Sequence, residues 1–233
     1  MQTTTLRRGA AALALAATLT GLAVAPALAA TPSYDFGDCP AIPAGVDATR
    51  WKCEVLTATG SLHLGSRDVP ELAPMTITHA EGPLPDSTKG QVWGALRGGP
   101  TPVPGGPPGL GLALQPEYGG RSDFYSVGDE MGLFTLRYRV VSPLLPPSCV
   151  IGGDDTPIEL RLKRVGSSEW VSKNPPVIKF AATDTAFKVP AATHCGPLGR
   201  LLNTRLGLPA QTGNTITLSA VYTFKTYDQL PAR

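Results

Sequence analysis

The sequence predicts an all-β protein, namely an antiparallel β-sandwich of the immunoglobulin-like or jelly-roll-like type with one short helix near its C-terminus. The 233 residues include 24 prolines and 26 glycines, which interrupt long helices. The hydrophobic content of 42% is nevertheless enough for a packed core. Several segments alternate apolar and polar residues with the two-residue period of a half-buried strand. These three observations together favour short strands separated by Pro/Gly turns.

Residues 1–30 have the composition of a secretory signal peptide. Arg7 and Arg8 provide a positive start, an apolar run follows, and residues 27–29 form a small-x-small cleavage pattern. About 20 apolar residues could also span a bilayer as an uncleaved anchor, but this run is mainly alanine and ends at a proline. We expect cleavage, no membrane span in the mature chain, and a secreted, extracellular or cell-wall-associated protein.

Cleavage would also remove the net charge of the chain. The 20 basic residues include Arg7 and Arg8, so 18 basic residues would remain against 18 acidic ones. A neutral, charge-poor chain lacks the electrostatic footprint of a protein that binds nucleic acid or an anionic membrane. We therefore expect neither partner, and we also expect no cofactor.

Three segments alternate most clearly, residues 131–141, 157–164 and 214–227, and each is expected to form a strand with one wet face. In the last segment one face carries Ile216, Leu218, Ala220, Tyr222 and Phe224. We expect this strand to be central in its sheet. Weaker candidates are residues 53–60, 61–66, 75–80, 91–98, 111–118, 177–182 and 186–190. A total of about nine or ten strands at this spacing is typical of an antiparallel sandwich.

Residues 97–111, RGGPTPVPGGPPGLG, have the composition of a loop or a linker. As a linker they would divide the mature chain into two domains. The part before them, however, offers too few confident strands to close a core of its own. We favour a long loop between strands, within a single domain formed by residues 31–233.

Residues 197–206 are the segment that reads most clearly as a helix. Pro197 suits the first turn, Gly207 suits the position just after the last turn, and Pro209 prevents continuation. One helical face would carry Leu198, Leu201, Leu202 and Leu206. Because so short a helix is marginal in water, these leucines must pack on the sheet.

Four cysteines, Cys39, Cys53, Cys149 and Cys195, all follow the expected cleavage site. An even number in an exported protein favours two disulfides, for which three connectivities are possible. We favour Cys39–Cys53 and Cys149–Cys195, because pairing nearest neighbours needs no crossing. The second bond would hold the entrance of the helix against the turn that follows the strand at 131–141.

Residues 142–162, 184–215 and, less closely, 35–55 resemble segments of uncharacterised exported proteins from high-GC Gram-positive (actinobacterial) bacteria. The resemblance implies export and a disulfide between Cys149 and Cys195. Since that family has no assigned activity, the resemblance identifies no catalytic residue and no ligand.

The histidine and cysteine residues include possible catalytic groups. His194 and Cys195 could in principle act as base and thiolate, but neighbouring side chains diverge and a half-cystine has no thiolate. We therefore expect both residues to be structural. His63 and His79 lie in expected strands, and the chain lacks the G-x-S-x-G motif that would point to a serine nucleophile. No catalytic residue is assigned.

Asp154 and Asp155 are weak candidates for a calcium site, because two acids fall short of the six or more oxygens that calcium needs and aspartate also favours turns. Trp170, in the polar context GSSEWVSKN, is a weak candidate for ligand binding. Possible pairs for glycoside hydrolysis are numerous among Glu54, Glu81, Glu117, Asp123, Asp129 and Glu159. Nothing in the sequence selects one pair.

We therefore expect a non-catalytic secreted or cell-surface protein with a binding or structural role. Its partner would be a protein, a lipid or a glycan such as that of the cell wall, bound through loops and the outer sheet face. The alternative is a secreted hydrolase, acting on a glycan or an ester, whose polar residues converge only in the folded protein. A deep pocket that holds two or more titratable groups within hydrogen-bond reach would separate the two.

Overall fold

The computed structural model describes residues 34–105, 109, 111–124 and 127–231, so the predicted signal peptide lies outside the described residues. With 57% strand and 7% helix, the all-β prediction is confirmed. The strands are β1 (Lys52–Leu64), β2 (Arg67–Pro83), β3 (Lys89–Gly98), β4 (Thr101–Pro102), β5 (Ala113–Asp123), β6 (Glu130–Val141), β7 (Val150–Ile151), β8 (Ile158–Lys173), β9 (Pro176–Asp184), β10 (Ala192–Thr193) and β11 (Thr215–Thr226).

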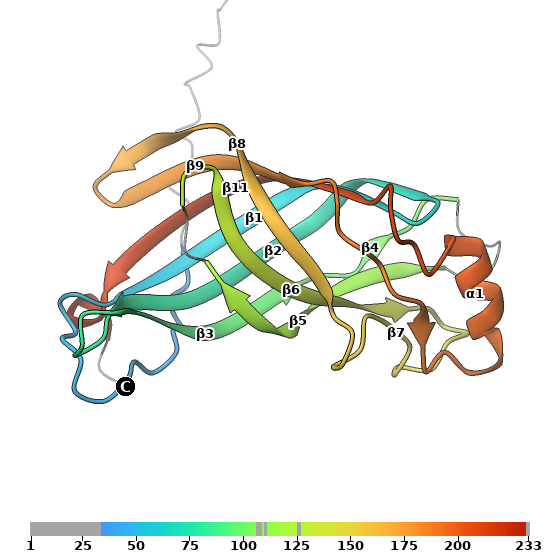
Figure 1. Ribbon diagram of the computed structural model, residues 1–233, viewed down its shortest axis with the longest axis horizontal. Helices are drawn as coiled ribbons and strands as arrows, with labels where there is room; N and C mark the ends of the chain where they lie inside the picture. Colours follow the sequence, from blue (N-terminus) through green and yellow to red (C-terminus); the bar gives the residue numbers. More distant parts are fainter. Residues whose placement is uncertain (1–33, 106–108, 110, 125–126, 232–233) are drawn as a thin grey trace, which may run out of the picture. The chain divides into compact units, whose positions relative to one another are not determined.

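All eleven of these strands belong to one antiparallel sheet, which curls into a half-barrel (Figure 1). The order is β10-β7-β6-β8-β9-β11-β1-β2-β3, and β5 pairs with β6 and with the short β4. The final strand β11 lies between β9 and β1, as expected for a central strand. Among the described residues no helix has the length and apolar character needed to cross a bilayer.

The sequence predicts two packed sheets, but the sandwich is not confirmed, because a single sheet bends around its own core. Register shifts interrupt several of the pairings, including β1 with β2 and β8 with β9. Such bulges bend and twist the strands that contain them. Strands β3 and β5 contact each other through side chains and not through a ladder of backbone hydrogen bonds. Gln115 Nε2 donates to the carbonyl of Gly98 at 3.0 Å, and the rings of Trp93 and Tyr118 stack with their centroids 3.8 Å apart.

The expected strand boundaries need two corrections. The two strands expected at 53–60 and 61–66 are one continuous strand, β1, which ends at Leu64. Residues 186–190 form no strand, and only Val189 makes an isolated bridge, to Ala210. Within residues 97–111, β4 pairs with β5, and the strands on either side, β3 and β5, belong to the same sheet.

Helix α1 (Gly199–Leu206) follows a short 3₁₀ turn, η1 (Gly196–Leu198), and ends at Gly207, as the sequence predicts. Leu202 and Leu206 are each only 1% exposed, whereas Leu201 is 43% exposed. The prediction of burial was therefore wrong for Leu201. With 3.6 residues per turn, Leu202 and Leu206 follow one line along the helix, and Leu201 lies to the side of that line.

Both predicted disulfides, Cys39–Cys53 and Cys149–Cys195, are confirmed, and all four cysteines are buried. The second bond ties the entrance of η1 to the residue that precedes β7. The exposed His194, next to it, has a φ of 57°, in the left-handed region. This residue forms the bend that turns the chain into the helix.

The C-terminal end of α1 packs on the turn between β1 and β2. The backbone N–H of Ser66 donates to the carbonyl of Leu206 at 2.9 Å, and Arg67 Nη2 donates to the carbonyl of Arg205 at 2.7 Å. These bonds satisfy carbonyl groups that a helix end otherwise leaves unpaired. The helix therefore covers the end of the half-barrel where β1 ends and β2 begins.

Candidate functional site

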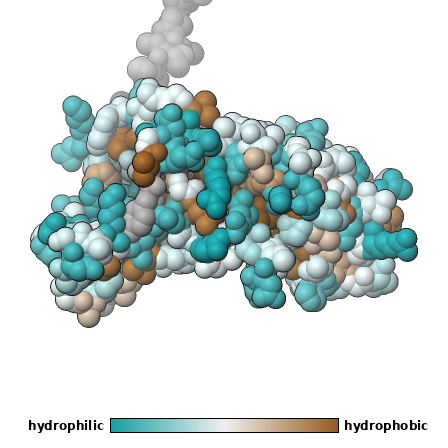
Figure 2. All heavy atoms as spheres, viewed as in Figure 1, coloured by the Kyte–Doolittle hydropathy of each residue, from teal (hydrophilic) through white to brown (hydrophobic). Residues whose placement is uncertain are grey.

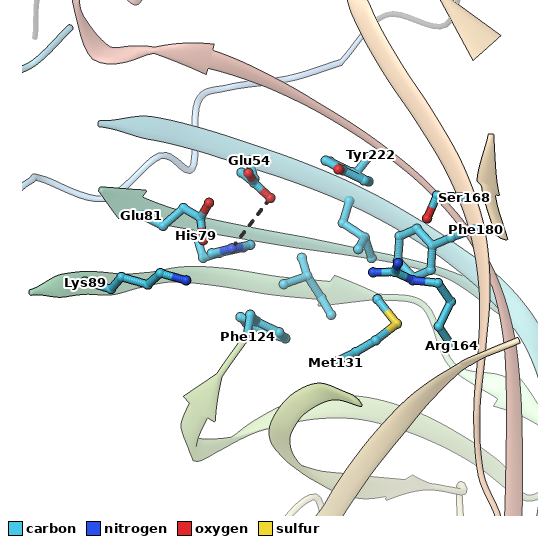
Figure 3. A pocket seen from close by; sticks show the side chains of 12 residues that line it. Glu54, His79, Glu81, Lys89, Phe124, Met131, Arg164, Ser168, Phe180 and Tyr222 are labelled. Carbon is cyan, nitrogen blue, oxygen red and sulfur yellow. Dashed lines mark ion pairs between the residues drawn. The ribbon is translucent and has the colours of Figure 1, made fainter. Parts of the chain in front are cut away.

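A cavity of about 290 Å³ lies on the concave face of the sheet (Figure 3). It includes Glu54 near the start of β1, whereas α1 packs beside the end of that strand. The core and the helix therefore fill one end of the half-barrel, and the cavity occupies the other. Its apolar wall consists of Leu56, Ile77, Phe124, Met131 and Phe180.

The strand register explains why the lining residues converge. Alternate residues of a strand point to the same face, so Glu54 and Leu56 of β1 both face the cavity. On β2 their direct partners are His79 and Ile77, and on β11 the partner of Leu56 is Tyr222. Three neighbouring strands thus supply one continuous floor.

Glu54 and His79 form the centre of the polar part of the cavity, with Glu54 Oε2 lying 3.8 Å from His79 Nε2. Burial, reinforced by the charge of Glu81, raises the pKa of Glu54 to about 7, although Lys52 acts in the opposite direction. Burial lowers the pKa of His79 to about 4. Around pH 6 both groups are therefore predominantly neutral. The Nδ1 atom of His79 is buried and has no hydrogen-bond partner in the described part of the chain.

The other polar groups surround this pair. Glu81 and Lys89 lie at the same end as His79, and Arg164 and Ser168 of β8 lie beside Phe180 (Figure 3). The Nε atom of Arg164 is buried without an acceptor among the described residues. Polar groups therefore stand at two places in the cavity, and apolar side chains lie between them.

The weak candidates for calcium and for ligand binding lie outside this cavity. Asp154 and Asp155 are both exposed, and Asp154 forms an ion pair with Arg137. The described ranges contain no group of three or more His, Cys, Asp or Glu side chains that could hold a metal ion. Trp170 is 53% exposed on β8 and does not line the cavity.

Among the three histidines, only His79 reaches the cavity. His63 Nδ1 lies 2.6 Å from Asp68 Oδ1 in an exposed pair. His194 is exposed, and Cys195 is bonded to Cys149, which leaves no thiolate for catalysis. The expectation that Cys195 is structural is confirmed.

A larger hollow of about 600 Å³ lies over β3 and β5, but its charged groups are already paired. Arg97 pairs with Asp38, and Glu117 pairs with Arg137 at 3.1 Å. On the face shown in Figure 2, apolar residues form small patches separated by hydrophilic ones. In the concave cavity, by contrast, two of the buried polar atoms that lack a hydrogen-bond partner among the described residues, His79 Nδ1 and Arg164 Nε, belong to lining residues.

The sequence names Glu54, Glu81 and His79 only as members of larger sets, and it does not single out Arg164 or Lys89. A signal for them exists nevertheless. Glu54 shares the alternation of Leu56 and Ala58, and Arg164 shares that of Leu160 and Leu162. A charged residue at an apolar position of a strand marks a polar group directed into the interior.

No protein-family model, curated protein or solved structure matches this chain.

Proposed function

We propose that the protein is exported and that it binds a small amphipathic molecule in the concave cavity without changing it chemically. One observation carries the proposal: among the described residues, His79 Nδ1 and Arg164 Nε are buried without hydrogen-bond partners in a cavity that apolar side chains also line. Buried polar atoms normally have hydrogen-bond partners. A ligand with a polar group and an apolar body would supply the missing contacts.

The volume of the cavity favours a compact, lipid-like ligand among the protein, glycan and lipid partners considered from the sequence. About 290 Å³ is close to the lower end of the range for ligand pockets. It accommodates one small molecule rather than a segment of a polymer. Apolar side chains from β1, β2, β6 and β9 would bury the ligand's hydrocarbon part.

Export is supported by the two disulfides, which fit an extracellular location because such bonds persist in oxidising compartments. Under this proposal, the protein meets its ligand outside the cytoplasmic membrane.

Calorimetric titration with 1-octanol tests the binding proposal. Wild-type protein should bind it, and Met131→Trp, which places a bulky ring in the cavity wall, should weaken binding by about tenfold or more. Ser219→Trp is the matched control, because Ser219 is exposed on β11 and does not line the cavity. If the wild type does not bind octanol, or both variants bind it equally well, the proposal is wrong.

Glu54 favours a second candidate function, hydrolysis of an ester or a glycoside. A carboxyl group whose pKa is about 7, beside a neutral histidine, is suited to general acid or base catalysis. Nitrophenyl esters and nitrophenyl glycosides test this directly. Turnover by the wild type that falls by about 100-fold in Glu54→Gln would support hydrolysis. No turnover by the wild type would exclude this candidate for these substrates.

A further inference from the structure

Arg164 presents a cationic group to the interior of the cavity. On β8 it pairs with Ala182 of β9, whose small side chain leaves room on the concave face. Figure 3 shows the guanidinium group of Arg164 directed toward Phe180 and Met131. Arg164 is partly exposed, and its Nε atom is buried against the cavity wall.

Within the described ranges, no carboxylate forms an ion pair with Arg164. Four other arginines of the sheet do have such partners: Arg97 with Asp38, Arg121 with Glu159, and both Arg137 and Arg139 with Glu117. In the described part of the chain the exposed Arg161 has none, but it lies in solvent. The buried Nε of Arg164 has no acceptor there either. A guanidinium group in an apolar setting is unfavourable without an acceptor, and a carboxylate fits its planar donors best.

A second donor of the same strand, Ser168, also lines the cavity. Ser168 lies on the same strand, where the register of β8 against β9 shifts between Val165 and Glu169. Figure 3 shows its hydroxyl group at the edge of the cavity. Such irregularities commonly redirect side chains near binding sites.

We propose that Arg164, assisted by Ser168, binds the carboxylate of the ligand, so that the cavity selects a monocarboxylic acid with a compact apolar body. The hydrocarbon part would extend along Leu56, Ile77 and Phe124 toward the Glu54–His79 pair. This assignment rests on the proposed function, because it names the ligand of the same cavity.

Octanoate and 1-octanol, which share a chain length and differ in charge, provide the test. Calorimetric titration at about pH 6 should show that the wild type binds octanoate about tenfold more tightly than octanol. Arg164→Gln should remove this preference, because its affinity for octanoate should fall about tenfold further than its affinity for octanol. Arg161→Gln is the matched control, since Arg161 is an exposed arginine on the same strand outside the cavity, and it should retain the preference.

Arg164→Met provides a second variant whose side chain is apolar and suits the cavity wall. It should also lose the preference for octanoate, and without ligand it should melt at a temperature no lower than the wild type, because an unpaired charge has been removed. If either folded variant keeps the preference for octanoate, or if octanoate and octanol lose affinity equally, Arg164 does not bind the carboxylate. Equal binding of both ligands by the wild type would contradict only this assignment, whereas binding of neither would contradict the proposed function as well.

Discussion

Glu54 and His79 are direct partners across β1 and β2, with Glu54 Oε2 lying 3.8 Å from His79 Nε2. Burial changes their pKa values in opposite directions, to about 7 for the carboxyl and about 4 for the imidazole. The charged groups that act on Glu54 are Glu81 across the strand pair and Lys52 on its own strand. The two side chains therefore stay predominantly uncharged together around pH 6, where an isolated pair in water would form ions.

The pair has a predictable effect on stability. Folding favours the neutral form of Glu54, so its stabilising contribution is complete below its ordinary pKa of 4.5 and is lost as pH rises to about 7. Folding also favours neutral His79, so its contribution is complete above its ordinary pKa of 6.5 and is lost as pH falls to about 4. Between pH 4.5 and 6.5 the two effects oppose each other, and in the wild type they should nearly cancel.

Single substitutions should separate the two contributions. When the pH is raised from 4.5 to 6.5, the unfolding free energy of Glu54→Gln should increase by about 2 kcal/mol relative to the wild type, because only His79 of the pair still titrates. His79→Gln should lose about 2 kcal/mol over the same interval. Urea unfolding at the two pH values measures both changes. Variants that follow the wild-type profile would show that the pair does not titrate as described.

The burial of the helix predicts a contrast between two adjacent leucines. Leu202 is 1% exposed in the core, so Leu202→Ala should destabilise the protein by about 2–5 kcal/mol. Leu201 is 43% exposed, so Leu201→Ala should change stability by no more than about 0.5 kcal/mol. Thermal unfolding of both variants measures the difference. Similar losses for the two would mean that α1 packs through a different face.

The disulfide at the helix entrance predicts a contrast between another adjacent pair. Cys195→Ser should cost about 2–5 kcal/mol, the usual effect of losing a native disulfide, and should leave Cys149 as a free thiol. His194→Ala should cost no more than about 1 kcal/mol, because this side chain is exposed. Denaturant unfolding gives both free energies, and mass spectrometry after alkylation counts the thiols. A labelled Cys195 in the untreated native protein would contradict the disulfide.

The contact between α1 and the β1–β2 turn predicts that replacing Gly65 by a larger residue destabilises the protein. Its φ is +62°, and a Cβ there would lie 2.1 Å from the carbonyl oxygen of Leu206. Gly45 has a similar φ of +81° but nothing within 4 Å, so it controls for backbone strain. Gly65→Ala should cost about 1–3 kcal/mol more than Gly45→Ala in denaturant unfolding. Equal costs would show that the helix moves aside easily.

The features that the sequence determined are those encoded locally. The alternation around Ile216 and Leu218 predicts β11, and the proline and glycine on either side of the helix predict where it begins and ends. The two disulfides follow from the order of four cysteines once export is inferred. In each case a few neighbouring residues, or their order along the chain, contain the whole signal.

The tertiary structure alone decided the half-barrel and the cavity. Bulges bend a single sheet around its core, and nothing in the strand alternation reveals where they occur. Glu54 meets His79 within the β1–β2 hairpin, and Arg164 lies beside Phe180 within the β8–β9 hairpin. The two hairpins share one cavity only because β11 pairs with both β1 and β9 in a particular register. A shift of one residue would direct either charged side chain to the opposite face of the sheet. Alternation therefore marks these residues as unusual, but long-range pairing brings them into one cavity.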